Sequence, residues 1–102
     1  MSASIERDAD GQISLSGVLD FQTVPALARQ AKTLLDKKDA TVVDCSQVVS
    51  SNSAGLALLL EMSRIMRATE QSIRFQNVPQ QIQTVAHAYG LIEPEQALEA
   101  IL

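Results

Sequence analysis

The chain has 102 residues, the length of one domain, and 46% of them are hydrophobic while 20% are charged. These values argue against a disordered or fibrous chain, and no apolar run approaches the roughly 18 residues that a membrane span needs. The net charge of −4, with Lys37-Lys38 as the only adjacent basic pair, argues against a nucleic-acid-binding surface. A lone cysteine and the lack of signal-peptide features predict a cytoplasmic protein of one domain, residues 1–102.

The first third of the chain predicts a hairpin followed by a helix. Residues 4–18 alternate apolar and polar side chains around Asp10-Gly11, a pair that suits a tight turn. Residues 24–36 place leucine and alanine on one helical face. Thr23 is the expected N-cap of this helix, and Pro25 fits its first turn because the missing N–H costs nothing there.

The rest of the chain alternates strands and helices. In chain order we expect a short buried strand at 41–43, a polar loop at 44–53, a helix at 53–69, a strand at 72–76, a helix opened by Pro79 with Tyr89 on its buried face, and a final short helix from Pro94. Gly90 is expected to stop the second-last helix, with Leu91 packing back across it. The order β-β-α-β-α-β-α-α predicts an α/β fold with a mixed sheet and helices mainly on one face.

The residues that enzymes use are scarce. His87 is the only histidine and Cys45 the only cysteine, which argues against a catalytic triad and against a zinc site. No phosphate-binding glycine loop is present, so we expect the chain neither to bind nor to hydrolyse ATP. The sequence therefore predicts a binding module with no catalytic residue, no metal and no cofactor.

The most informative segment opens the helix at residues 53–69. Asn52 or Ser53 can cap it, and Ala54-Gly55 leaves its first turn almost bare. This arrangement is also typical of an ordinary capped core helix. On a helical wheel, however, Leu56 and Leu60 fall at the border of the core arc, in line with the Ser53 hydroxyl, where they would suit a protein partner. The predicted partner-binding residues are Ser51, Asn52, Ser53, Ala54, Gly55, Leu56, Leu60 and Arg64.

These motifs resemble a known family. The run Asp44-x-Ser46 after a buried strand, followed by Asn52-Ser53-Ala54-Gly55-Leu56 at the start of a leucine-rich helix, is similar to the STAS domain. The stretch Leu15-Ser16-Gly17-Val18-Leu19-Asp20 resembles the family's L-x-G-x-L-D pattern, and Asn77-Val78-Pro79 and Tyr89-Gly90-Leu91 fit as well. The resemblance covers essentially the whole chain and implies a STAS-like single domain.

Differences within the motif favour one branch of the family. Anti-sigma-factor antagonists typically read Asp-Ser-Ser-Gly-Leu and are phosphorylated on the second serine, where this chain has Ala54 and no hydroxyl. The MlaB-type pattern, Asp-Thr-Gly-Gly-Leu followed by Ala-Leu-Leu-Leu, is matched by Ser53 and by the run Leu56–Leu60. The resemblance implies a cytoplasmic subunit of an Mla-type ABC transporter, peripheral at the inner membrane through its complex.

In such a complex the subunit would bind the ATPase subunit and support its assembly and activity. The permease and a periplasmic lipid-binding subunit would complete the complex, which moves phospholipid and maintains outer-membrane lipid asymmetry. Two alternatives remain open. One is a regulatory antagonist that binds a kinase-like anti-sigma factor and is phosphorylated at Ser53, and the other is a small-ligand-binding domain.

Overall fold

The computed structural model describes residues 2–35 and 40–91. Its elements are β1 (Ala3–Arg7), β2 (Ile13–Leu19), α1 (Val24–Leu35), β3 (Ala40–Ser51), α2 (Ser53–Ala68), β4 (Ser72–Gln76) and α3 (Gln80–Ala88). The order β-β-α-β-α-β-α confirms the predicted α/β fold over the described part of the chain. The helix expected from Pro94, and the pair Lys37-Lys38, lie outside the described residues.

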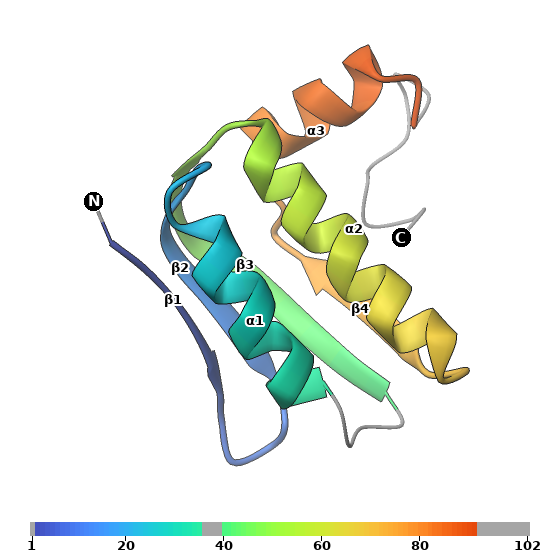
Figure 1. Ribbon diagram of the computed structural model, residues 1–102. Coiled ribbons are helices and arrows are strands. Elements are labelled where there is room, and N and C mark those ends of the chain that lie inside the picture. The colour runs from blue at the N-terminus through green and yellow to red at the C-terminus, as the bar shows by residue number, and fades with distance from the viewer. Residues whose placement is uncertain (1, 36–39, 92–102) are drawn as a thin grey trace.

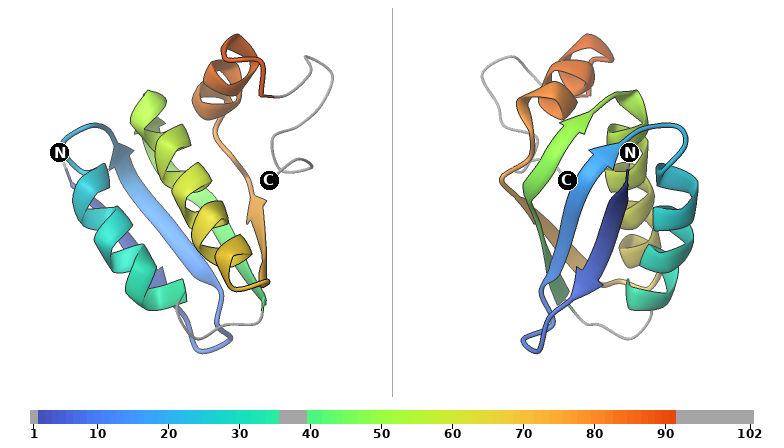
Figure 2. Two further views of the ribbon diagram at one scale, coloured as in Figure 1. Left: turned by 45° about the vertical axis from the view of Figure 1, so that its right-hand side comes forward. Right: turned by 90° about the vertical axis from the view of Figure 1, so that its left-hand side faces the viewer.

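The sheet is mixed, and its strand order is β1-β2-β3-β4. β1 and β2 form the predicted antiparallel hairpin, whereas β3 pairs in parallel with β2 and with β4. Parallel pairing follows from the helical connections, because a strand that returns through a helix runs in the same direction as the strand before it. Figures 1 and 2 show α1 and α2 side by side on one face of the sheet, which confirms that the helices gather mainly on one side.

β3 is much longer than the sequence predicted. The expected loop at 44–53 is wrong for most of its length, because Val43–Ser51 pairs with Ile13–Leu19 of β2. Two register shifts interrupt this pairing, and they break the period-two alternation by which a strand is recognised in sequence. Val49 has no partner in β2 and is 75% exposed. The extended β3 carries the chain directly to the start of α2.

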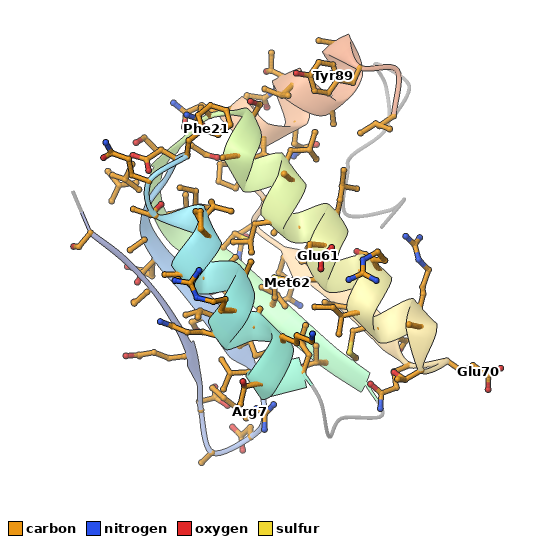
Figure 3. The ribbon with its side chains drawn as sticks, in the orientation of Figure 1. Arg7, Phe21, Glu61, Met62, Glu70 and Tyr89 are labelled. Atoms are coloured by element: carbon orange, nitrogen blue, oxygen red, sulfur yellow. The ribbon has the colours of Figure 1, made fainter. Side chains whose placement is uncertain are left out.

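The core lies between the sheet and its two covering helices. Leu27, Ala31 and Leu35 of α1 are buried, as the helical spacing predicted. The other large buried side chains include Ile13, Leu15, Leu19, Leu58, Leu59, Met62 and Met66. Figure 3 shows Met62 on the side of α2 that faces the sheet. Cys45 is also buried, as expected of a small apolar side chain, although it lies within β3 and not at its end.

The N-terminus of α1 is capped differently from the prediction. Thr23 does not cap the helix, because its hydroxyl oxygen accepts the N–H of Asp20 at 3.0 Å, outside the helix, while the hydroxyl donates to the carbonyl oxygen of Val18 at 2.7 Å. The side chain of Asp20 instead accepts the backbone N–H groups of Gln22 and Thr23, each at 2.9 Å. These hydrogen bonds hold the chain in a tight turn between β2 and α1.

The end of α3 agrees with the predicted glycine stop but not with the predicted packing. Gly90 has φ +73°, and the N–H of Leu91 donates to the carbonyl oxygen of Ala86 at 2.9 Å. Tyr89 is 67% exposed and Leu91 is 43% exposed, so neither packs onto the described part of the core. Tyr89 follows the last helical residue and lies at the end of α3 away from the sheet (Figure 3).

Candidate protein-interaction site at the start of α2

Asn52 is the residue that caps α2. Its side-chain oxygen accepts the N–H of Ala54 at 2.8 Å, and its own N–H donates to the carbonyl oxygen of Leu19 at 3.1 Å. Asn52 therefore fixes the start of the helix against the end of β2. Ser53, the other candidate for the cap, is the first residue of the helix and is half-buried. Its hydroxyl makes no hydrogen bond within the described residues, and so it is available to a partner.

Ser51 and Gly55 bring α3 against the start of α2. The N–H of Ser51 donates to the side-chain oxygen of Gln81 at 2.8 Å, and its hydroxyl donates to the carbonyl oxygen of Asn52 at 2.9 Å. A Cβ at Gly55 would overlap the Ser51 hydroxyl and lie 3.2 Å from Cδ1 of Ile82. This contact explains the glycine. No sequence pattern singles out Gln81, because an exposed glutamine on a helix is ordinary.

Three residues of the predicted site are buried within the domain. Ala54 is 3% exposed, Leu56 is 2% exposed and Gly55 is buried. The wheel placed Leu56 at the border of the core, and this was wrong. The reason is that α3 packs against the first turns of α2. The sheet, α1 and α3 together bury a wider arc of α2 there than the sheet and α1 would bury alone.

The accessible residues form a line along the helix. Ser53, Ala57, Leu60 and Arg64 are spaced by four, three and four positions, which places them on one face. Ala57 and Arg64 are exposed, and Ser53 and Leu60 are half-buried. Leu60 packs partly against the core and leaves the rest of its side chain accessible. The face combines the Ser53 hydroxyl, the small side chain of Ala57, the large apolar side chain of Leu60 and the guanidinium of Arg64, and arginine is enriched at protein interfaces.

A surface ion pair continues this face toward the C-terminal half of α2. Arg64 donates to both carboxylate oxygens of Glu61, with Nε–Oε1 at 2.8 Å and Nη2–Oε2 at 2.6 Å. The Arg64 hydrogen bonds hold the pKa of Glu61 below its ordinary value, and the carboxylate raises the pKa of Arg64. Figure 3 shows Glu61 on the outer side of α2. Because the side chains are 65% and 41% exposed, solvent screens the attraction and the pair contributes little to stability.

Phe21 extends the candidate site beyond the residues that the sequence singled out. It lies in the turn between β2 and α1, is 70% exposed, and is found at the end of the molecule where α2 begins (Figure 3). The Asp20 contacts fix this turn, and the N–H of Thr23 is the main group that lowers the pKa of Asp20. An aromatic side chain in a polar turn was the available signal, since aromatic residues are frequent anchors of interfaces.

The Asp44-x-Ser46 motif acts as a structural link. The Asp44 carboxylate accepts the Ser46 hydroxyl at 2.7 Å and the side-chain amide of Asn77 at 2.8 Å. These two hydrogen bonds, that of Asn77 first, lower the pKa of Asp44. Asn77 begins the connection from β4 to α3, so the motif ties β3 to the segment that positions α3 beside the start of α2.

Other features of the surface lie apart from this site. A depression of about 400 Å³ lies at the opposite end of β3, where it is lined by residues that include Gln12, Thr41 and Arg74. Among residues 2–35 and 40–91, no three His, Cys, Asp or Glu side chains gather as metal ligands would. Within the same residues, every helix is too short or too polar to cross a lipid bilayer.

The mixed sheet, the helices on one face and the capped α2 define the STAS fold. An unphosphorylated anti-sigma factor antagonist, SpoIIAA, shares this fold with a TM-score of 0.67 and 17% identity, over 87% of this chain and 81% of that one. An anti-sigma factor antagonist from Mycobacterium paratuberculosis gives the same TM-score with 26% identity, over 87% of this chain and 79% of that one.

The sequence also identifies the family. Residues 3–99 match the family model described as "Mlab, STAS domain", and the chain belongs to this family. Among curated proteins no relative matches the chain significantly. STAS domains mediate interactions between proteins, in agreement with the accessible face found at the start of α2.

Proposed function

We propose that this chain is the non-catalytic STAS subunit of an Mla-type phospholipid transporter and binds the ATPase subunit through the start of α2. The observation that carries the proposal is the accessible line of Ser53, Ala57 and Leu60, in a chain that matches the MlaB-type family over residues 3–99. The subunit supports the assembly and activity of the ATPase. It lies at the cytoplasmic side of the inner membrane, where the complex with permease and periplasmic lipid-binding subunits holds it.

The chemistry of the motif supports this choice over a phosphorylation switch. Ala54 has no hydroxyl and is 3% exposed, so a kinase finds neither an acceptor group nor an accessible side chain there. Ser53 presents an unpaired hydroxyl beside small residues, which lets the backbone of a partner approach the first turn closely. Phe21 and Leu60 add apolar area on which an interface can gain free energy.

Co-purification from the native host tests the proposal. The tagged full chain is expected to recover the ATPase and permease of an Mla-type transporter in constant proportion. Reconstituted complexes that contain the chain are expected to hydrolyse ATP faster than complexes that lack it. Recovery of no transporter subunit, with unchanged ATP hydrolysis on addition of the chain, would contradict the proposal.

A second candidate is an anti-sigma-factor antagonist, favoured by the likeness to the mycobacterial antagonist and by the Ser53 hydroxyl. A helix N-terminus stabilises a phosphate group, so Ser53 is a chemically reasonable acceptor. In this case the tagged chain recovers a kinase-like anti-sigma factor, and incubation of the two with ATP yields a phosphopeptide that contains Ser53. The transporter subunit is expected to give neither result.

A further inference from the structure

The charges of residues 2–35 and 40–91 are strongly segregated. In α1 and α2 the charged residues are Arg29, Lys32, Glu61, Arg64 and Arg67, which gives these two helices a net charge of +3. The other described residues carry a net charge of −4, from Arg7 and Arg74 against Glu6, Asp8, Asp10, Asp20, Asp44 and Glu70. An acidic protein thus presents a basic surface on its helical layer, which we name the basic helix face and define by Arg29, Lys32, Arg64 and Arg67.

The four cations of the basic helix face are accessible and only partly neutralised. All four side chains are exposed, and Glu61 is the one acidic group on these two helices. Arg64 is paired with Glu61, and α1, which carries Lys32, packs against α2. Within the described residues Arg29 and Arg67 have no ion-pair partner. In α1 and α2 a single carboxylate is therefore available to neutralise four cations.

We propose that the basic helix face docks an acidic segment of a protein partner, with the partner's carboxylates beside Arg29, Lys32 and Arg67 and its apolar side chains on Ala57 and Leu60. Charge complementarity of this kind speeds association and selects among partners. The inference rests on the proposed function only in taking the partner to be a protein, and it adds that the partner's contact segment is rich in Asp and Glu.

An anionic membrane fits the same charges less well. Membrane-surface helices insert large apolar side chains. In the part of the chain that the structure describes, the exposed large hydrophobic residues are Phe21, Val49, Tyr89 and Leu91, and all four lie outside α1 and α2. The net charge of −4 also repels an anionic bilayer, and Glu61 lies among the cations. A protein segment can place its carboxylates between these groups, whereas a lipid surface presents charge evenly.

A titration followed by nitrogen-15 NMR of the full chain tests the proposal. The probe is a synthetic peptide in which Glu alternates with Ala and Leu, and its control is the same peptide with Gln in place of Glu. At low ionic strength the Glu peptide is expected to shift signals of α1 and α2, and the shifts are expected to disappear at high salt. Lys32→Glu combined with Arg67→Glu should weaken binding at least about tenfold, whereas Arg74→Glu, on β4, should change it less than about twofold.

Each other outcome overturns the proposal. Absence of shifts, equal shifts with the Gln peptide, or shifts confined to β1, β2 and β4 would remove the basic helix face as an acid-binding surface. Tighter binding to phosphatidylglycerol-containing vesicles than to the peptide would assign the face to a membrane. A chain that binds the Glu peptide as expected but recovers no transporter ATPase refutes the proposed function while upholding this inference. Circular dichroism of each variant confirms that it remains folded.

Discussion

Leu59 and Leu60 are neighbours in α2 with opposite expected roles, and truncation of each to alanine separates packing from recognition. Leu59 is 0% exposed, so Leu59→Ala leaves a cavity in the core and should cost about 2–5 kcal/mol. Leu60 is half-buried, and since full burial of a leucine is worth about 1.5–3 kcal/mol, Leu60→Ala should cost about 1 kcal/mol. The two substitutions remove the same atoms from adjacent positions of α2, and each therefore controls for the other.

Thermal unfolding followed by circular dichroism measures this difference. A loss of about 1 kcal/mol lowers the melting temperature by about 4–8 °C in a domain of this size. Leu59→Ala should therefore lower the melting temperature by at least about 8 °C, and Leu60→Ala should lower it by no more than about 8 °C. Equal, large losses in both variants would place Leu60 in the core. That result would refute the assignment of Leu60 to the accessible face of α2.

Four further expectations follow from the described contacts. Ser53→Ala should change stability by less than about 0.5 kcal/mol, because the hydroxyl is unpaired, yet weaken ATPase binding several-fold in a pull-down titration. Asp44→Ala should destabilise the protein at pH 7. Because folding lowers the Asp44 pKa below 3.8, the stability difference from wild type in urea unfolding should shrink as the pH falls below about 4. Gly17→Ala should cost more than about 1 kcal/mol in the same assay, since φ is +89° and the added Cβ overlaps the carbonyl oxygen of Ser2. Calorimetry of the isolated chain with ATP should show no saturable binding.

Elements with a regular apolar period could be predicted from the sequence. The alternation around Ile13 and Leu15 identified β2, and the spacing of Leu27, Ala31 and Leu35 identified the buried side of α1. Such patterns are visible because one face of each element meets the core and the other meets solvent. The order of elements followed from these patterns, and the parallel pairing followed from the order.

The second half of β3 escaped prediction because its bulges break the period, and Val49 is turned outward where a regular strand would pair it. The wheel failed at Leu56 for a different reason. A wheel assumes one buried arc, and the sequence of α2 does not reveal that α3 covers its first turns.

The candidate site was predicted in its position but not in all of its members. The small residues and the polar cap identified the start of α2, and the structure selects Asn52 as the cap. Phe21 and Gln81 were missed because both reach the site from other parts of the chain. Proximity of this kind depends on the packed fold and leaves no periodic trace in the sequence.

Binding of Leu60→Ala to the purified ATPase subunit is the decisive test of whether the accessible face of α2 contacts the ATPase. Isothermal titration calorimetry would compare wild type, Leu60→Ala and Arg74→Ala, the last being an exposed residue of β4. We expect Leu60→Ala to raise the Kd at least about tenfold and Arg74→Ala to leave it within about twofold, because a few anchors carry most of an interface's free energy. Wild-type affinity in a folded Leu60→Ala, or no binding by the wild-type chain itself, would contradict an ATPase interface on the accessible face of α2.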